Sequence, residues 1–396
     1  MNLKTSTSQL MEPIRLLLLN YEYPPLGGGA GVVTKHLVKE FSEKQIHTTL
    51  VTTWFEGLKE EEHAEGLSIY RLKSRRRKTF QSNPVEMISW MKHAIHFFSN
   101  RENQYDVCLS NFMLPGGGVA YYLKRKWNLP YVVLSHGHDI PWGFPQQMWF
   151  YHALLYPFLW FIATRSAHNV LLTATMKAMA DRFTGKAHAS KNLVIPNGIE
   201  RAVLPGKDFN AEMQVIFGGR LVAQKDPYTF LQAVKMVQLA GIRVRWTVVG
   251  DGEMREGMAA MVKKEQLAQV NFTGKIPHDE LLALFRRAHL FISSSTYEAM
   301  SLTTLEALSN GAYVLSTPVS GTTGYVIEDV SGNFFPFGDA EKLAQGILQY
   351  YHQKFLNHYE LPAERFPEFS HQYDWKSIAE LYHILFRNCK MEAGNL

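Results

Sequence analysis

The chain has 396 residues, more than one hydrophobic core usually serves, so its length predicts two domains. Hydrophobic residues make up 46% of the chain and charged residues 19%, which excludes a disordered protein and fits a globular one with ample core. The formal net charge is only +5, which is too small to indicate nucleic-acid binding.

Two cysteines, Cys108 and Cys389, are too few for a disulfide framework or a cysteine-rich metal site. The polar amino-terminal segment has no signal-peptide pattern. The longest apolar segment, Met148 to Ala163, is interrupted by His152 and Pro157 and is too short to span a bilayer. We therefore expect a cytoplasmic protein in which any contact with a membrane is peripheral.

In chain order, short β-rich runs alternate with segments of helical periodicity. The first half contains IRLLLL (14–19), a helix over 30–42, TTLVTT (48–53), VCLS and YVVLS. The rhythm restarts near residue 212 with MQVIFGG, a helix over 228–239, VRWTVVG, a helix over 255–266, VNFTG, HLFISS and YVLST. This alternation is typical of parallel sheets and predicts an α/β protein with two doubly wound, Rossmann-like domains.

Prolines and glycines break the periodicity over residues 194–210, which is therefore the expected linker. We place the first domain at residues 1–196 and the second at 197–370. Residues 374–387 have apolar positions at helical spacing, so we expect a helix within the last segment, 371–396.

Two clusters of charge follow the strand TTLVTT. Five glutamates crowd the segment from Glu56 to Glu65, which we expect to be a loop, and a block of six basic residues runs from Arg71 to Lys78. Such runs are usually solvated faces. Contact of the basic block with anionic lipid stays open as an alternative, ahead of nucleic acid.

The first motif, LGGGAG (26–31), follows the first strand and opens the first helix. Backbone amides and the helix dipole at such a place can receive an anion, and glycines let a ligand approach closely; a plain tight turn is the alternative. The spacing is not GxGxxG, and no acidic residue ends the second strand to hold an adenosine ribose. A nicotinamide dehydrogenase is therefore not indicated.

The second motif, SHGHD (135–139), ends a strand at the carboxyl edge of the sheet, where α/β proteins bind ligands. A ligand contact by this segment is therefore favoured over simple packing. His136, His138 and Asp139 stand nearly in a row and do not easily converge on one ion, so we expect no metal here.

The second half offers cations at a strand end. Gly219 and Arg220 close its first strand, and Lys225 follows just before a helix start at Asp226-Pro227. Two cations beside a helix amino terminus can neutralise a diphosphate without a metal. The next strand ends in a tight turn at Gly250.

The most specific motif is YEAMSLTTLEAL, which follows the strand HLFISSS. Ser301 or Thr303 can begin a helix, which leaves Glu298 in the loop ahead and places Glu306 in the first turns. Glu298 can then reach ligand hydroxyls, Glu306 can hold a diol such as ribose, and the first helical amides can bind a phosphate. The alternative is a capped helix with two solvent-exposed carboxylates.

Taken together, these residues resemble the retaining glycosyltransferases of family 4, which have the GT-B fold. The motifs stand in family order as LGGGAG, SHGHD, GGRLVAQKD, VVGDGEM, the run from VNFTGKIPHDELL to YVLST, and SGNFFPFGD. The resemblance implies two Rossmann-like domains that face an interdomain cleft, with the donor bound mainly by the second and the acceptor by the first. It also implies catalysis without a metal or other cofactor, and a last helix that crosses back to the first domain.

The resemblance assigns roles residue by residue. It makes Arg220 and Lys225 the diphosphate clamp, Glu306 the ribose ligand, Glu298 the contact to the transferred sugar, and His136 a contact near the reacting carbon. His136, Glu298, Arg220 and Lys225 are thus the expected catalytic set. The other donor-side positions are Gly28, Gly29, Gly219, Gly250, Lys275, Ile276, Ser301, Leu302 and Thr303, and the acceptor-side positions are His138 and Asp139.

The implied function is the retaining transfer of a hexose from a nucleotide-diphosphate donor to a glycan or lipid-linked acceptor, in polysaccharide or glycolipid synthesis. A UDP-sugar is the favoured donor and GDP-mannose the second. A nucleotide-sugar epimerase of the same architecture and a non-catalytic nucleotide-sugar-binding protein stay open as alternatives. One departure concerns the donor sugar, because many members have Gly-Phe-Gly where this chain has Ala299-Met300-Ser301.

The acceptor side combines the basic block with many aromatic residues, a combination typical of proteins that bind the surface of an anionic membrane. It indicates a lipid-linked acceptor on the inner face of a membrane. The alternative is that these aromatics belong to a buried core helix. They are Trp142, Phe144, Trp149, Phe150, Tyr151, Phe158, Trp160 and Phe161.

Overall fold

The computed structural model describes residues 12–79, 82–141, 149–200, 206–362 and 372–394. Trp142, Phe144 and residues 201–205 of the expected linker lie outside these ranges. The chain forms two compact units. Unit 1 takes its residues from 1–172, 176–195 and 375–396, and unit 2 from 173–175 and 196–374.

Unit 1 is built on an eight-stranded sheet with the order β3-β4-β2-β1-β5-β6-β7-β8. All neighbouring strands are parallel except the edge pair of β3 and β4. The strand order reverses at β1, which lies between β2 and β5. The strands are β1 (Ile14–Leu19), β2 (Ile46–Thr53), β3 (Glu61–Ala64), β4 (Leu67–Leu72), β5 (Val107–Asn111), β6 (Tyr131–Leu134), β7 (His168–Leu171) and β8 (Asn192–Val194).

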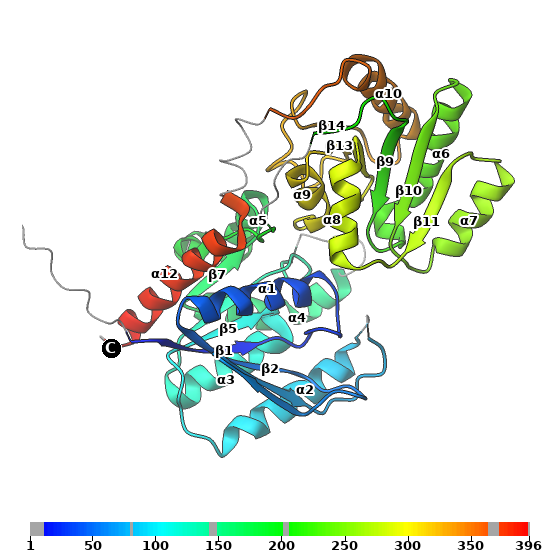
Figure 1. The fold of residues 1–396 in the computed structure, drawn as a ribbon. Helices are drawn as coiled ribbons and strands as arrows, with labels where there is room; N and C mark the ends of the chain where they lie inside the picture. Colours follow the sequence, from blue (N-terminus) through cyan, green and yellow to red (C-terminus); the bar gives the residue numbers. More distant parts are fainter. Residues whose placement is uncertain (1–11, 80–81, 142–148, 201–205, 363–371, 395–396) are drawn as a thin grey trace, which may run out of the picture. The chain divides into compact units, whose positions relative to one another are not determined.

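The helices of unit 1 cover both faces of this sheet. α1 connects β1 to β2, whereas α2 to α5 connect strands that follow one another in the opposite direction along the sheet. Because parallel crossovers are right-handed, α1 lies on one face of the sheet and α2 to α5 lie on the other. α12 packs beside α1 (Figure 1). Phe41 of α1 meets Tyr382 and Phe386 of α12 edge to face. The helices are α1 (Gly29–Glu43), α2 (Pro84–Ser99), α3 (Gly118–Trp127), α4 (Trp149–Arg165), α5 (Ala174–Thr184) and α12 (Trp375–Gly394), with short turns η1 (Phe112–Gly117) and η2 (Lys186–Lys191).

Unit 2 has a six-stranded parallel sheet with the order β11-β10-β9-β12-β13-β14. Phe217 stacks on Phe230 in its core, and Trp246 packs against Phe230. The strands are β9 (Met213–Gly218), β10 (Val244–Val249), β11 (Val270–Gly274), β12 (Leu290–Ser293), β13 (Tyr313–Ser316) and β14 (Gly332–Phe334). The helices are α6 (Pro227–Leu239), α7 (Arg255–Lys264), α8 (His278–Arg287), α9 (Leu302–Ser309) and α10 (Ala340–Tyr350), with short turns η3 (Ala223–Lys225) and η4 (Tyr351–Phe355).

Two Rossmann-like sheets, one fully parallel and one parallel except at its β3–β4 edge, confirm the expected α/β fold class. One expectation was wrong: part of the glutamate-rich segment is not a loop but the edge strand β3, paired antiparallel with β4. Arg71 of β4 binds Glu62 of β3 at 2.9 Å, so opposite charges on the two strands stabilise the hairpin. A short, charged strand is a common form of sheet edge and carries little hydrophobic signal.

The basic block from Arg71 to Lys78 is not the continuous exposed patch that its sequence indicates. The side chains of Arg71 and Arg76 are 5% and 0% exposed. Arg76 lies over the ring of Tyr21, pairs with Glu22 at 3.5 Å and donates to two backbone carbonyls. Arg76 therefore holds the segment that follows β1, and Arg71 holds β3 and the loop before it, whereas Lys73, Arg75, Arg77 and Lys78 are exposed.

Candidate functional site

The donor-side residues of unit 2 follow the carboxyl ends of its strands. Arg220 follows β9, Gly250 follows β10, Lys275 and Ile276 follow β11, and Glu298 lies beyond β12. The strand order reverses at β9, which lies between β10 and β12. Ligands of doubly wound sheets bind at this kind of switch point, so the topology of unit 2 places these residues where a ligand is expected.

Two glycines let the backbone turns at this edge approach closely. A Cβ at Gly250 would lie 2.0 Å from the carbonyl oxygen of Gly219, so no side chain fits there. Gly219 and Gly250 both have positive φ, at 129° and 118°. Their role in unit 2 is therefore to shape the turns behind Arg220, whose side chain is exposed.

Lys225 and Glu298 form an ion pair at this edge. Their side chains are 15% and 13% exposed, and Glu298 Oε1 also accepts a hydrogen bond from Ser295 Oγ at 2.9 Å. The sequence assigned these residues to different parts of a donor, the diphosphate and the sugar. In the structure each neutralises the other, which avoids two uncompensated charges in a half-buried place.

Helix α9 begins at the first of the two positions that the sequence predicts, Ser301 and Thr303. Ser301 is its N-cap, and its hydroxyl accepts from the amide of Thr304 at 3.4 Å. That amide is therefore engaged within the helix, which leaves the amides of Leu302 and Thr303 as the phosphate donors of this terminus. Tyr325, which sequence reasoning did not single out, holds the cap by donating to Ser301 O at 3.1 Å.

Glu306 lies in α9 and pairs with His278 at the start of α8, 2.9 Å from Oε1 to Nε2. The hydrogen bond to Glu306 raises the pKa of His278 above its ordinary value. Glu306 is therefore a carboxylate held in place by a neighbouring helix, with its second oxygen able to accept from a diol. Sequence reasoning missed His278, which stands 28 positions before Glu306.

Gly321 supports the loop that carries Glu298. A Cβ there would lie 2.8 Å from the Cβ of Glu298 and 2.9 Å from the Cα of Met300. Ser320 donates to the carbonyl of Glu298 at 2.8 Å, and Ser301 N donates to Gly321 O at 3.3 Å. The loop in which Ala299-Met300-Ser301 replaces the family's Gly-Phe-Gly is therefore packed closely against Ser320 and Gly321.

In unit 1, His136 follows β6 and donates from Nε2 to Asn111 Oδ1 at 2.8 Å, at the end of β5. Burial, and then the neighbouring His138, lower the pKa of His136 to about 3. His136 is therefore neutral at physiological pH, and its Nδ1 carries a lone pair that can accept a hydroxyl hydrogen. Asn111 is fully buried, and its amide nitrogen has no hydrogen-bond partner among the described residues.

Asp139 is engaged by its own unit. One carboxylate oxygen accepts from Ser135 Oγ at 2.5 Å and the other from the amide of Met113 at 3.0 Å. Burial raises the pKa of Asp139. The residue is 9% exposed, so it positions the segments after β5 and β6, whereas the side chain of His138 is exposed beside it.

The glycine turn after β1 divides into two kinds of position. Gly27 has a positive φ of 85°, and a Cβ there would meet Glu22 at 2.5 Å, so its own loop requires glycine. A Cβ at Gly28 or Gly29 would meet nothing within 4 Å. The packing of unit 1 therefore does not explain these two glycines, and close approach of a ligand remains a reason for them.

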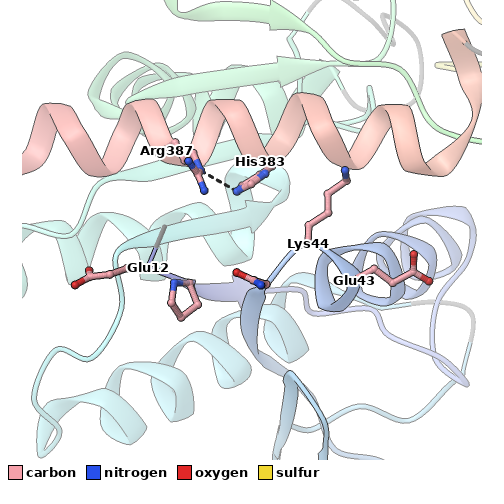
Figure 2. A pocket seen from close by; sticks show the side chains of 7 residues that line it. Glu12, Glu43, Lys44, His383 and Arg387 are labelled. Atoms are coloured by element: carbon pink, nitrogen blue, oxygen red, sulfur yellow. Dashed lines mark hydrogen bonds between the residues drawn. The ribbon is translucent and has the colours of Figure 1, made fainter. Parts of the chain in front are cut away.

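A cavity of about 240 Å³ lies at the opposite edge of the unit 1 sheet. Figure 2 shows His383 and Arg387 of α12 above the amino end of β1, with Arg387 bound to His383 at 2.9 Å. Lys44 at its rim pairs with Glu380. Because doubly wound sheets bind ligands at carboxyl ends, we assign this cavity to the seam between α12 and the sheet.

No group of three or more His, Cys, Asp or Glu side chains within the described ranges could hold a metal ion. None of the helices that the structure describes is both long and apolar enough to cross a membrane.

Two family models match consecutive parts of this chain. The family model for glycosyltransferase family 4 matches residues 27–203, and that for glycosyl transferases group 1 matches residues 206–365. An uncharacterised glycosyltransferase of Methanocaldococcus jannaschii is 22% identical over 92% of this chain and 95% of that protein. A putative teichuronic acid biosynthesis glycosyltransferase of Bacillus subtilis is 24% identical over 63% of this chain and 62% of that protein.

Solved structures resemble the whole fold. Sucrose-phosphate synthase from Thermosynechococcus elongatus superposes with a TM-score of 0.79 at 19% identity, covering 95% of this chain and 98% of that one. An Anabaena protein in complex with UDP and glucose superposes with a TM-score of 0.73 at 15% identity, covering 95% and 100%. At these identities, the likeness is one of fold.

Proposed function

Because this chain belongs to the glycosyltransferases of family 4 and has the GT-B fold, we propose that it transfers a hexose with retention from a nucleotide-diphosphate sugar to a glycan or lipid-linked acceptor. Unit 2 binds the donor in this proposal, and unit 1 binds the acceptor. The observation that carries it is the pairing of Lys225 with Glu298 at the switch point of the unit 2 sheet.

The pair explains how one small region serves both halves of a donor. A diphosphate near Arg220 and the amides of Leu302 and Thr303 competes with Glu298 for Lys225. Once Lys225 turns to the phosphates, the carboxylate of Glu298 is left to accept hydrogen bonds from hydroxyls of the sugar. The ion pair is therefore the resting form of a site that exchanges an internal anion for the anion of the donor.

In the chemical step, the acceptor hydroxyl forms a bond to the anomeric carbon on the face from which the diphosphate departs. The carbon–oxygen bond to the diphosphate breaks, and a phosphate oxygen takes the hydroxyl proton. Lys225 and Arg220 stabilise the negative charge that develops on the leaving diphosphate. Neutral His136 accepts a substrate hydroxyl hydrogen at Nδ1 and adds no positive charge.

The donor base is tested by thermal unfolding with UDP, GDP, ADP and CDP. A ligand that binds only the folded state raises the unfolding midpoint. We expect the largest rise with UDP, because a UDP-sugar is the favoured donor and structural neighbours are described in complex with UDP and glucose. A larger rise with GDP would identify GDP-mannose as the donor class, and no rise with any of the four would contradict donor binding.

A second experiment separates transfer from its alternatives. The protein is incubated with donor alone and then with donor plus a candidate acceptor glycan or glycolipid. An epimerase releases nucleotide and an altered sugar without an acceptor, whereas a transferase releases nucleotide quickly only when the acceptor is present. A binding protein gives a thermal shift but no release under either condition.

We also propose that transfer needs no divalent metal. The positive groups of the site are Arg220, Lys225 and helix amides, which supply the field that a metal ion would otherwise provide. Activity should be unchanged by EDTA. Loss of activity in EDTA with recovery on addition of Mg²⁺ or Mn²⁺ would overturn this part of the proposal.

A further inference from the structure

Helix α4 of unit 1 is apolar on the side that faces outward. Phe158, Leu154, Trp149 and Phe150 are 65%, 64%, 62% and 61% exposed. Four of the five exposed Phe and Trp side chains among the described residues lie on this helix. We call the set the aromatic face of α4, and it comprises Trp149, Phe150, Tyr151, Leu154, Phe158 and Trp160.

The exposure of the aromatic face does not result from loose packing of α4 against the rest of unit 1. The inner side of α4 buries Leu159 and Ile162, and the flanks are closed by two aromatic contacts. Tyr121 of α3 meets Phe161 at 4.8 Å, and Phe183 of α5 meets Tyr156 at 5.2 Å between ring centroids. α4 is therefore already docked between its neighbours, and the aromatic face points away from them.

An ordinary surface helix is polar on its outer side, because exposed apolar area is costly in water. The outer side of α4 holds one formal charge, Arg165, at its carboxyl end. Phe150, Leu154 and Phe158 follow each other at spacings of four and form one line along the helix. A contiguous apolar patch of this kind marks a surface that contacts a membrane or a partner.

The charge around α4 favours an anionic occupant. The segment from Gly118 to Lys191, which includes α3, α4 and α5, contains eight Lys and Arg residues against two Asp and Glu. Its net charge of +6 exceeds the +5 of the whole chain. Arg125, Arg182 and Lys186 are exposed on the elements beside α4. A second copy of the same face would carry the same charge and be repelled.

We propose that the aromatic face of α4 docks on the surface of an anionic membrane and presents a lipid-linked acceptor to unit 1. Trp and Tyr rings suit the interface between headgroups and acyl chains, and the surrounding cations are attracted to anionic headgroups. The lipid-linked acceptor rests on the proposed function, whereas the docking of α4 does not. The contact is thus assigned to α4 rather than to the basic block 71–78.

The helix is also tied to the expected acceptor side. The Nε2 atom of His152, buried on α4, donates to the carbonyl of His138 at 2.8 Å. His138 belongs to the segment after β6 that carries His136 and Asp139. A membrane that receives the aromatic face therefore lies beside a helix bonded directly to this segment.

The test is flotation with vesicles of phosphatidylglycerol and phosphatidylcholine, compared with pure phosphatidylcholine. The wild type should float with the anionic vesicles. Leu154→Ser/Phe158→Ser should lower the partition coefficient by about tenfold or more, because two large apolar side chains no longer enter the interface. The control is Val85→Ser/Ile88→Ser on α2, where the side chains are 59% and 53% exposed, and it should float like wild type.

Three outcomes would overturn docking: wild type that stays at the bottom with anionic vesicles, a Leu154→Ser/Phe158→Ser variant that floats as well as wild type, or a lipid-free dimer that this variant abolishes. The last result would identify a second copy as the occupant. A thermal shift with nucleotide diphosphate is measured on every variant. A retained shift without flotation overturns docking alone, and no shift even in wild type overturns the proposed function.

Discussion

The carboxyl edges of the two sheets share a topology but differ in their electrostatics. In unit 2, Lys225 pairs with Glu298 and His278 pairs with Glu306. In unit 1, burial lowers the pKa of His136 to about 3 and raises the pKa of Asp139. One edge therefore presents ions held by exchangeable partners, and the other presents groups that burial drives toward their neutral forms.

The difference indicates what each edge can bind. A charged ligand entering unit 2 takes over a counter-ion that already exists, so no new charge has to be desolvated alone. A charged ligand entering unit 1 beside a neutral imidazole would find no such partner there. The unit 1 edge instead suits uncharged hydroxyl groups, which can donate a hydrogen bond to the lone pair on His136 Nδ1.

The largest expected effect comes from removing the cation of unit 2. Lys225→Met should reduce kcat/KM for transfer by a factor of about 10² to 10³, comparable to the loss of one oxyanion donor. Steady-state kinetics with saturating acceptor measure it. The matched control is Lys235→Met, because Lys235 pairs with Glu265 on the surface of the same unit, away from the switch point. Equal losses in both variants would contradict the role of Lys225.

A second comparison separates the two carboxylates of unit 2. Glu306→Gln should weaken nucleotide diphosphate binding by about tenfold, since the variant would lack the charge-assisted hydrogen bond to the ribose that the proposed function assigns to Glu306. Glu298→Gln should leave binding unchanged or tighten it, because Lys225 no longer has a competing anion, and should still abolish transfer. Calorimetric titration with the nucleotide diphosphate gives both affinities, and a similar loss in both variants would refute this division of roles.

Local signals in the sequence were sufficient for much of this site. Asp226 was expected at a helix start and caps α6, with its carboxylate accepting from the amide of Thr229 at 3.4 Å. Ser301 was one of two expected caps and caps α9. Such features depend on residues three positions apart, so their spacing alone predicts them. Hydrophobic runs likewise located the buried strands on either side of both switch points.

Features that depend on distant residues could not be predicted in this way. The sequence predicts that Arg76 belongs to an exposed basic run, but in the structure Arg76 is buried and pairs with Glu22, which lies 54 positions earlier. The residues near Lys225 in the sequence do not predict its ion pair with Glu298, which lies 73 positions later. The aromatic residues of α4 show the same limit. A helix that is apolar on all sides has no periodic pattern, so its sequence does not show which of its apolar residues are buried and which are exposed.

The neutral character of the unit 1 edge can be broken by Asn111→Asp. A carboxylate beside His136 should raise the pKa of the imidazole by about one to three units from its value of about 3. Protonation of Nδ1 removes the lone pair, so the variant should lose activity severalfold near pH 5 and little at pH 8. The pH profile of kcat/KM measures this shift. Asn111→Asp/His136→Gln, which has the carboxylate without the imidazole, should lack the new acid limb.

The smallest expected effect concerns the pH dependence of unit 2. The pKa of His278 is raised in the folded protein by Glu306, so the stabilising charge on the pair is fully present below the unfolded value of about 6.5 and is lost as pH rises through the folded value. Because the His278 side chain is 38% exposed, screening keeps the effect on stability modest.

Above the folded pKa of His278 the site carries one more net negative charge, and nucleotide diphosphate affinity should fall about two- to threefold. His278→Gln keeps a donor for Glu306 but does not titrate, so its affinity should be flat with pH. If wild type and variant show the same dependence, the change belongs to the phosphate or to another group, and His278 does not couple protonation to donor binding.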